Sequence, residues 1–398
     1  MPTDGYALTC NRFVSVMLGA MAAVTHPALA KAGEVRVEPF GQTTDGEQVT
    51  AYTLINASGA SATILDYGGT IAAIRVPDRH GKLDNVVLAF PNLEDWETVG
   101  HANANIGRYA NRIRGGFTLD GVHYPLNPGT NGITLHGGPP PYSKRIWKLL
   151  STAKEGTPSV TLRLVSPDAD QGFPGELVID AKYTLTNTNE LYLEFVATTG
   201  ATTIVNLTNH IYFNLNGNGT TSVYGQHLRL AADRIAVKDE VGMPSGELRL
   251  VAGTELDLRD EAPVIQLVSG ARNQVFAAPR VSANPPNPGQ LANFDHSYVF
   301  PEGFGGLTEV AARLEDDTSG RTLELRTTEP SIQVYVPGRR AGVLAEGGGP
   351  LRLGPAIALE TQHLPDSPNH REWPSTELRP GETYRTTTIW SFGVQTGD

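Results

Sequence analysis

Alternation of apolar and polar residues is the main pattern along the chain. In residues 177–185 every second position is apolar, while Asp180, Lys182 and Thr184 occupy the positions between them. The polar segment 186–189 interrupts this pattern, and the alternation resumes at Leu191. A period of two is typical of a β-strand with one buried face. The region therefore predicts two strands joined by a short polar turn.

Shorter runs of the same kind recur through the chain. They predict further strands at residues 160–165, 322–326, 332–336 and 386–392. Pro-Gly and Asn-Gly pairs punctuate the sequence, as at 128–129 and 131–132, and such pairs mark turns. Helical periodicity is scarce, and only residues 93–98 predict a helical turn. We expect an all-β fold, with an α+β protein as the alternative.

The sequence gives no sign of several domains. No repeat of about 40 residues is visible, which argues against a propeller. The proline-rich segments 139–141 and 284–288 have the character of loops rather than linkers. We therefore predict a single large antiparallel β-sandwich over residues 31–398.

The first thirty residues have the pattern of a secretory signal. An apolar run from Phe13 to Val24 follows Arg12 and precedes Ala28-Leu29-Ala30. The run is shorter than the ~20 residues of a membrane span, and the A-x-A ending is typical of a cleavage site. We predict a signal peptide over residues 1–30 and export to the periplasm or medium, with a buried segment of the fold as the alternative. No later segment is apolar enough to span a bilayer, so we expect no membrane association after cleavage.

Composition narrows the class of protein. Of the 398 residues, 39% are hydrophobic and 18% are charged, which suits a protein with a buried core. The net charge of −11 argues against nucleic acid as a partner. The single cysteine, Cys10, excludes a disulfide framework and a cysteine-based zinc site.

Polar residues capable of chemistry collect in separate segments. The segments are 107–113, 135–138, 206–215, 294–298 and 358–368. Their histidines have no H-x-H or H-x-x-x-H spacing, so we expect no metal site. Phosphate-binding glycine loops and a G-x-S-x-G motif are also missing from the sequence, which argues against nucleotide cofactors and a serine nucleophile.

The residue types in these segments suit a sugar. Each sugar hydroxyl donates and accepts hydrogen bonds, and aromatic faces cover its C–H patches. One histidine and one glutamate can supply an acid and a base near neutral pH. Other interpretations stay open: His210 as a structural histidine, Glu360 as a solvated strand end, and Arg112 as a surface charge.

Six or more motifs occur in a fixed order. They are GRYANRI at 107–113, LHGG at 135–138, GFPG at 172–175, NLTNHIYFNL at 206–215, DH at 295–296, and LETQH at 359–363 followed by PDSP at 365–368. In this order and spacing the chain resembles the aldose 1-epimerase (galactose mutarotase) family from roughly Tyr52 to Phe392. The resemblance implies a β-supersandwich with an open cleft. It also implies cofactor-free interconversion of the α- and β-anomers of a free aldose such as glucose or galactose.

The resemblance also assigns roles to individual residues. Glu360 matches the family's general base, and His210 matches its general acid. The residues that match its sugar-binding positions are Asn111, Arg112, His136, Asp295 and Gln333. Tyr212 lies two residues beyond the acid and is expected to line the same cleft.

Two segments depart from the family pattern. PPPYSK stands at 139–144 where the family commonly has Gly-Phe-Asp-Lys, and VPG at 336–338 replaces Thr-Gly-Asn. We expect both on loops near the cleft, where they affect the choice of sugar. Residues 273–292, rich in Pro and Asn, also have a variable character.

Three other functions remain possible at this stage. A hexose-6-phosphate epimerase would need basic residues for the phosphate, and Arg145, Arg339 and Arg340 are available. A glycoside hydrolase would need two carboxylates, for which Asp295 and Glu360 are candidates. A non-catalytic sugar-binding protein could use the same scaffold. We expect a monomer or a weak dimer.

Overall fold

The computed structural model describes Met1 and residues 33–127, 129–153, 156–217, 220–268, 293–337 and 344–395. Ala32–Asp398 is one compact unit, separate from Met1–Lys31. The predicted signal peptide, apart from Met1, lies outside the described residues, as do the variable segment 273–292 and Arg339 and Arg340.

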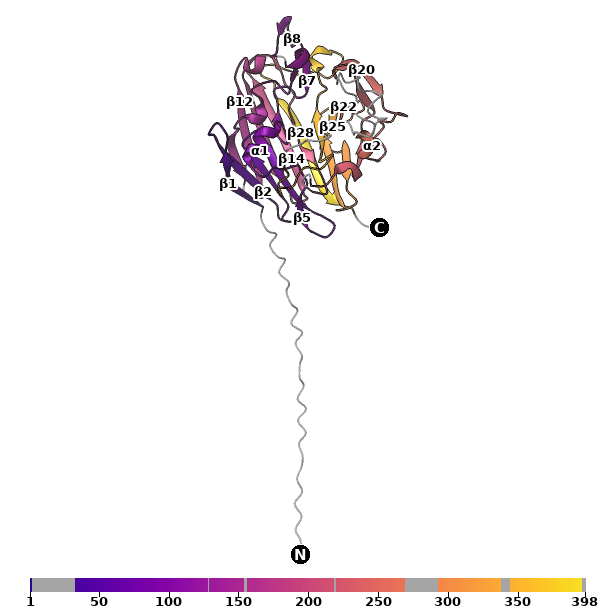
Figure 1. The fold of residues 1–398 in the computed structure, drawn as a ribbon. Coiled ribbons are helices and arrows are strands. Elements are labelled where there is room, and N and C mark those ends of the chain that lie inside the picture. Colours follow the sequence, from indigo (N-terminus) through magenta and orange to yellow (C-terminus); the bar gives the residue numbers. More distant parts are fainter. Residues whose placement is uncertain are drawn as a thin grey trace. The chain divides into compact units, whose positions relative to one another are not determined.

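The largest sheet has nine antiparallel strands in the order β11-β12-β13-β14-β28-β24-β23-β18-β21 (Figure 1). In that order they are β11 (Lys148–Ala153), β12 (Ser159–Ser166), β13 (Leu177–Leu185), β14 (Glu190–Thr199), β28 (Tyr384–Val394), β24 (Arg321–Thr327), β23 (Ala312–Glu315), β18 (His227–Leu230) and β21 (Ala262–Pro263). β13 and β14 are the predicted pair of strands, with Leu185 opposite Leu191. The other predicted strands lie within β12, β24, β28 and β25 (Ser331–Val336), which confirms the β-strand predictions.

A second sheet has six antiparallel strands in the order β17-β26-β25-β22-β19-β20. In that order they are β17 (Tyr212–Phe213), β26 (Ile357–Gln362), β25 (Ser331–Val336), β22 (Phe294–Val299), β19 (Arg234–Lys238) and β20 (Pro244–Leu250). All six residues of β26 are buried, so both of its faces are covered. One face of this strand carries Ile357 and Leu359 into the main hydrophobic core. Its other face carries Glu360.

A third sheet has five strands, β1 (Glu34–Gln42), β2 (Gln48–Ile55), β3 (Ser61–Leu65), β4 (Thr70–Pro77) and β5 (Leu83–Asn85). Four pairs of short strands complete the fold: β6 (Asn105–Ile106) with β16 (Thr208–Asn209), β7 (Arg112–Arg114) with β10 (Ile133–Leu135), β8 (Phe117–Leu119) with β9 (Val122–Tyr124), and β15 (Thr203–Ile204) with β27 (Glu377–Leu378).

Helices are few among the described residues. α1 (Leu93–Val99) is the predicted helical turn, and the side chain of Asn92 caps it by accepting from the backbone N–H of Asp95. α2 (Ile265–Val268) is a single turn. Five 3₁₀ turns cover Thr130–Gly132, Tyr142–Lys144, Asp170–Gly172, Val223–Gly225 and Ser367–Asn369.

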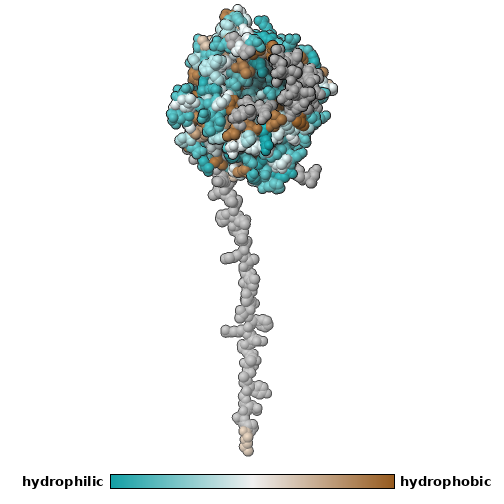
Figure 2. Space-filling model, in the orientation of Figure 1, coloured by the Kyte–Doolittle hydropathy of each residue, from teal (hydrophilic) through white to brown (hydrophobic). Residues whose placement is uncertain are grey.

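One continuous hydrophobic core connects the three larger sheets. Leu54 of β2, Ile179 of β13 and Ile332 of β25 are fully buried members of the same cluster. On the face shown in Figure 2, hydrophobic residues with described positions are scattered among hydrophilic ones, which is normal for a folded surface. The observed architecture confirms the prediction of an all-β antiparallel sandwich.

Candidate active site

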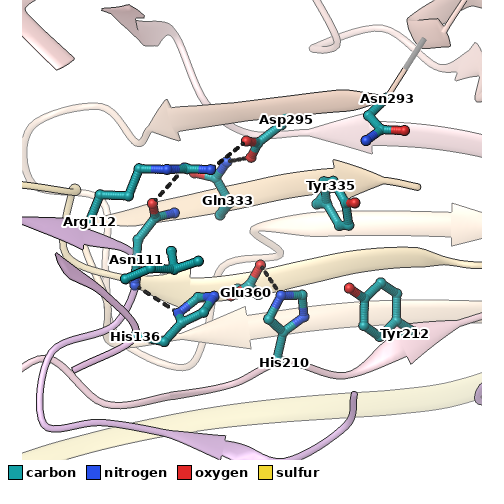
Figure 3. Close-up of a pocket in the computed structure, with 11 residues that line it drawn as sticks. Asn111, Arg112, His136, His210, Tyr212, Asn293, Asp295, Gln333, Tyr335 and Glu360 are labelled. Carbon is teal, nitrogen blue, oxygen red and sulfur yellow. Dashed lines mark hydrogen bonds and ion pairs between the residues drawn. The ribbon is translucent and has the colours of Figure 1, made fainter. Parts of the chain in front are cut away.

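A cavity of about 300 Å³ opens over one face of the six-stranded sheet. Its lining residues are Asn111, Arg112, Leu135, His136, His210, Tyr212, Asn293, Asp295, Gln333, Tyr335 and Glu360 (Figure 3). All eight site residues predicted from the sequence are among them. The structure thus brings together side chains that lie up to 249 positions apart (Asn111 and Glu360) in the chain.

The strand register of the six-stranded sheet determines which side chains form the floor of the cavity, that is, the face of the sheet that lies under it. Gln333 on β25 is directly opposite Glu360 on β26. Asp295 on β22 is directly opposite Tyr335, two residues further along β25. Directly opposed residues of an antiparallel pair share one face of the sheet, and so do residues two apart in a strand. These four side chains therefore belong to one polar face, against which the sugar can lie.

Tyr212 extends this floor by one strand. It is directly opposite Ala358, which is itself opposite Tyr335. The small alanine between the two tyrosines lets their rings meet, with centroids 6.2 Å apart at 69°. In Figure 3 the tyrosines lie at one end of the site, and Arg112, Asn111 and His136 lie at the other.

Asn111 and His136 are fixed by one another. Both have left-handed backbone conformations, with φ of 63° and 51°. The backbone N–H of His136 donates to the carbonyl of Asn111 at 2.8 Å. The backbone N–H of Asn111 donates to His136 Nδ1 at 3.1 Å. Because an N–H can only donate, Nδ1 is the acceptor, and Nε2 carries the proton of the neutral imidazole.

The charge state of His136 agrees with this tautomer. Burial, together with the positive charges of His101, His210 and Arg112, holds the pKa of His136 well below its usual value. A neutral imidazole with a protonated Nε2 is a hydrogen-bond donor. His136 can therefore donate to a sugar hydroxyl without adding charge to the site.

His210 is held by backbone hydrogen bonds on both sides. Its N–H donates to the carbonyl of Ala104 at 2.9 Å, and its carbonyl accepts from the N–H of Asn103 at 2.9 Å. Its ring stacks on Tyr212, with centroids 4.8 Å apart at 21°. This arrangement points Nε2 at the carboxyl group of Glu360, and the distance to Oε1 is 3.5 Å (Figure 3).

Glu360 is the most buried carboxyl group of the cavity, with a side chain only 2% exposed. Its second oxygen, Oε2, has no hydrogen-bond partner within the part of the chain that the structure describes. Burial raises the pKa of Glu360 to about 8, the negative charge of Asp295 adds to the rise, and Arg112 opposes it. Once ionised, such a carboxylate is a stronger base than an exposed one.

Asp295 has the opposite electrostatic environment. Arg112 Nη2 lies 3.3 Å from its Oδ2, Lys238 Nζ lies 3.5 Å from the same oxygen, and Gln333 Nε2 donates to Oδ1. Partial burial acts to raise the pKa of Asp295, but the charges of Lys238 and Arg112 outweigh it and lower the pKa well below its usual value. Asp295 therefore stays ionised and acts as a hydrogen-bond acceptor.

Arg108, in the same motif as Arg112, has a structural role. Its side chain is fully buried, and Nη1 donates to the carbonyls of Pro174 and Gly175 at 2.8 and 2.7 Å. Its guanidinium also lies 5.7 Å from the ring centroid of Phe173. The motifs at 107–113 and 172–175 are thus partners in space, although the sequence alone did not connect them.

Two of the four histidines in the motifs lie outside the cavity lining. His363 Nδ1 contacts Glu329 Oε2 at 2.8 Å in a buried pair. His296 follows Asp295 in β22 and is buried against Phe294, with ring centroids 4.7 Å apart. Burial lowers the pKa of His296 to about 3, with a contribution from Lys238, so this histidine is neutral. Both histidines therefore have a structural role rather than a place in the cavity.

The structure adds three residues to the site, Leu135, Asn293 and Tyr335. Tyr335 and Asn293 each lie two positions from a predicted site residue, Gln333 and Asp295. The period of two in a strand was a usable signal for Tyr335. Asn293 precedes the first residue of β22, and Leu135 lies in β10 beside His136, so neither position follows from strand alternation.

The described residues of the segments 139–144 and 336–338, which depart from the family pattern, are not part of the cavity lining. Gln171 Nε2 donates to the carbonyls of Gly138 and Pro140, which packs the proline-rich loop against the 3₁₀ turn at Asp170–Gly172. Val336 is buried at the end of β25, next to Tyr335. Gly338 lies outside the described residues.

The described residues contain no group of three or more His, Cys, Asp or Glu side chains arranged to hold a metal ion. Among the same residues, no helix is long and apolar enough to cross a lipid bilayer.

An antiparallel β-sandwich whose cavity holds a histidine–glutamate pair, further polar side chains and two tyrosine rings is the arrangement expected of an enzyme that acts on sugars. The sequence profile described as aldose 1-epimerase matches residues 50–391, and the chain belongs to this family. The predictions of the family, of the fold class and of an isomerase of the aldose 1-epimerase type are confirmed.

Individual relatives agree with this assignment. The chain is 35% identical over 358 residues to a galactose mutarotase of Mus musculus, covering 89% of this chain and 97% of the relative. It is 33% identical over 352 residues to an aldose 1-epimerase of Escherichia coli K12, covering 87% and 96%.

Solved structures have the same fold. An aldose epimerase homologue from C. elegans matches with a TM-score of 0.74 and 26% identity, covering 91% of this chain and all (100%) of the other. A galactose 1-epimerase from Lactobacillus acidophilus matches with a TM-score of 0.75 and 22% identity, covering 91% and 99%, and this likeness concerns the fold alone.

Proposed function

We propose that this chain interconverts the α- and β-anomers of a free hexose such as glucose or galactose, with Glu360 as general base and His210 as general acid. The observation that carries the proposal is the pairing of His210 Nε2 with Glu360 Oε1 at 3.5 Å in a cavity lined by hydroxyl-binding groups. One of these groups takes a proton while the other gives one, which is the requirement for opening a hemiacetal.

The reaction conserves all atoms and needs no cofactor. The Glu360 carboxylate removes the proton of the C1 hydroxyl, the C1–O5 bond breaks, and protonated His210 delivers its proton to the ring oxygen. The product is the open-chain aldehyde. After rotation about the C1–C2 bond, the C5 hydroxyl attacks the other face of the carbonyl, with the two groups in reversed roles.

The remaining side chains hold the sugar and support the charge that develops. Asp295 accepts from a hydroxyl, and neutral His136 donates to one. Asn111, Arg112 and Gln333 supply further polar contacts at the same end of the cavity. Tyr212 covers an apolar face of the ring. Donors fixed before the sugar arrives stabilise developing charge without rearranging.

A sugar phosphate fits the described site less well. Arg145 pairs with Asp170 at 2.6 Å and does not line the cavity. Among the described residues, Arg112 is the one Arg or Lys in the lining, and it is engaged by Asp295. The proposal is therefore a free hexose rather than its phosphate.

Hydrolysis of a glycoside is also disfavoured by the contacts of Asp295. A retaining hydrolase needs a second carboxylate that is free to attack C1. Both oxygens of Asp295 are already engaged, Oδ2 by Arg112 and Lys238 and Oδ1 by Gln333. We expect no nitrophenol release from nitrophenyl glycosides, and its release would identify a hydrolase instead.

Polarimetry on freshly dissolved α-D-glucose and α-D-galactose tests the proposed function. Glu360→Gln and His210→Ala each remove one proton-transfer group, so kcat is expected to fall about 10²–10⁴-fold. Asp180→Asn, on β13 and outside the cavity, is the matched control and should keep the wild-type rate. A wild-type rate in either site variant would contradict the role assigned to that residue. If the wild-type protein itself were inactive, the proposed reaction would be wrong, and a non-catalytic sugar-binding protein would be the remaining interpretation.

We further propose that the protein is exported after removal of residues 1–30, and that the mature chain is a monomer or a weak dimer. The apolar run and the Ala28-Leu29-Ala30 ending support export. The compact unit starts at Ala32, so cleavage after Ala30 would leave it whole. Sedimentation of the mature chain at micromolar concentration tests its oligomeric state.

A further inference from the structure

We propose that Lys238 is a positioning residue that fixes the carboxylate of Asp295 and thereby sharpens the recognition of one sugar hydroxyl. The inference rests on the proposed function, because it concerns how the same site holds its substrate. Lys238 does not line the cavity. Its described contacts with a residue of the cavity lining are those to Asp295, so we expect its effect on the sugar to pass through that carboxylate.

Neighbouring strands bring Lys238 to Asp295. β19 pairs with β22 through Arg234 opposite Val299 and Ile235 opposite Tyr298. Lys238 is the last residue of β19, and Asp295 is the second residue of β22. The side chain completes the approach, since Nζ donates to the backbone carbonyl of Asp295 and lies 3.5 Å from its Oδ2.

The burial of Lys238 points to a function for its charge. Its side chain is only 8% exposed, and a buried ammonium group is costly unless a carboxylate and hydrogen bonds compensate it. Asp295, 29% exposed, provides both of these while keeping access to the cavity. The ion pair thus joins a buried ammonium group, that of Lys238, to a carboxylate that faces the cavity, that of Asp295.

Three separate elements converge on the carboxylate of Asp295. Arg112 reaches Oδ2 from β7, Lys238 reaches the same oxygen from β19, and Gln333 donates to Oδ1 from β25. A second ion pair, Arg114 Nη2 to Asp239 Oδ2 at 2.5 Å, ties the residue after Lys238 to β7. β7 and the end of β19 are therefore joined through Asp295 and again by this second ion pair. With contacts from three elements, the carboxylate of Asp295 has little freedom to rotate.

A fixed carboxylate discriminates between sugars more sharply than a mobile one. A site built to hydrogen-bond a hydroxyl rejects the analogue that lacks it, because the buried acceptor is then left unpaired. Without Lys238, Asp295 could turn toward Arg112 or accept water instead. The expected result is weaker binding of the preferred hexose and a smaller difference between glucose and galactose.

Lys238→Gln is the most informative variant. The amide can still donate to the backbone carbonyl of Asp295, but it cannot supply the positive charge beside Oδ2. We expect KM for the preferred hexose to rise about tenfold, the scale of one charge-assisted hydrogen bond, with kcat within about threefold of wild type. Lys238→Arg keeps the charge and should restore most of the affinity. Lys182→Met, an exposed lysine paired with Glu194 on the nine-stranded sheet, is the control and should leave KM unchanged.

A double-mutant cycle with Asp295→Asn separates positioning from general structure. If Lys238 acts through the carboxylate, Lys238→Gln should raise KM far less in the Asp295→Asn background than in the wild type. An equal factor in both backgrounds, or an unchanged KM in Lys238→Gln, would overturn the inference. If Lys238→Gln does not fold, the same cycle can be made with Lys238→Arg and Asp295→Asn. A tenfold rise in KM in Lys238→Arg that persists in the Asp295→Asn background would also contradict the inference. A wild-type KM in Asp295→Asn alone would contradict the proposed role of Asp295 and, with it, this inference, while leaving the acid–base roles of Glu360 and His210 untouched.

Discussion

At the scale of single residues, two carboxyl groups on one face of a sheet have opposite proton affinities. Burial raises the pKa of Glu360 to about 8, whereas Lys238 and Arg112 hold the pKa of Asp295 low. The two values also depend on each other, because the charge of Asp295 contributes to the raised pKa of Glu360. The difference separates a proton acceptor for catalysis from a permanent anion for binding.

This coupling predicts the pH dependence of an Asp295 variant. General-base catalysis needs ionised Glu360, so kcat/KM should rise as the pH rises through the pKa of Glu360 in the free enzyme. Asp295→Asn removes a neighbouring negative charge, which lowers that pKa and moves the acidic limb to lower pH. The plateau should also fall about tenfold, because a charge-assisted hydrogen bond to the sugar is weakened.

The measurement is kcat/KM by polarimetry from about pH 5 to about pH 9, roughly two units on either side of neutrality. In the control, Asp180→Asn, the limb should coincide with that of the wild type. A limb that stays in place or moves to higher pH in Asp295→Asn would show that Asp295 does not tune Glu360.

At the scale of elements, hydrogen bonds between segments align the acid with the base. Thr208 Oγ1 in β16 donates to the carbonyl of Thr361 in β26 at 2.8 Å. Asn206 exchanges two hydrogen bonds with the backbone of His363, at 3.2 and 3.0 Å. The segment that carries His210 is thereby set in register with the strand that carries Glu360. The polar residues before His210 in its motif therefore serve mainly to position it.

Arg108 has the corresponding role for the segment that carries Asn111 and Arg112. Arg108→Met would leave the carbonyls of Pro174 and Gly175 without their charged donor in a buried site. The free energy of unfolding is expected to fall by about 2–4 kcal/mol, since unsatisfied buried polar groups are costly. Urea denaturation followed by fluorescence provides the measurement.

The matched control for this prediction is Arg36→Met on β1. Arg36 pairs with Glu34 on the surface, and both side chains are largely exposed. Its replacement should change stability by no more than about 0.5 kcal/mol. Equal losses in both variants would mean that the buried hydrogen bonds of Arg108 do not stabilise the fold.

At the scale of the whole molecule, the last strand of the chain closes the nine-stranded sheet. β28 lies between β14 and β24 and pairs with both along most of its length (Figure 1). The compact unit therefore needs its C-terminal strand, whereas its first strand, β1, begins only at Glu34. Residues before Ala32 belong to a separate unit.

This division leads to a prediction for the mature protein. Protein recovered from the periplasm or medium should have an intact mass that corresponds to a chain beginning near Lys31. A chain produced directly from Lys31 should have the same Tm and the same mutarotation rate as the exported protein, because it keeps every described strand, from β1 at Glu34 onward. A full-length chain confined to the cytoplasm would contradict the proposed export.

Much of the fold and of the site follows from local sequence patterns. The alternation at 177–185 predicts β13, because a strand with one buried face must alternate. The ordered motifs contain seven of the eight predicted residues of the cavity lining, and the resemblance to the family supplied the eighth, Gln333. Without that resemblance, residue type alone would not separate Arg112 from Arg108, or His210 from His363, because a buried structural group and a substrate-binding group can have the same local sequence.

The tertiary structure alone decided how these residues work together. Strand register places Gln333 opposite Glu360, and side-chain contacts connect Lys238 with Asp295. Both depend on the approach of segments that are distant in the chain. The proton affinities of Glu360 and Asp295 depend on burial and on neighbouring charges, which no local pattern contains. The sequence by itself thus determined the class of fold, the family and the residue types of the site. Long-range packing decided which of those residues meet, and with what charge.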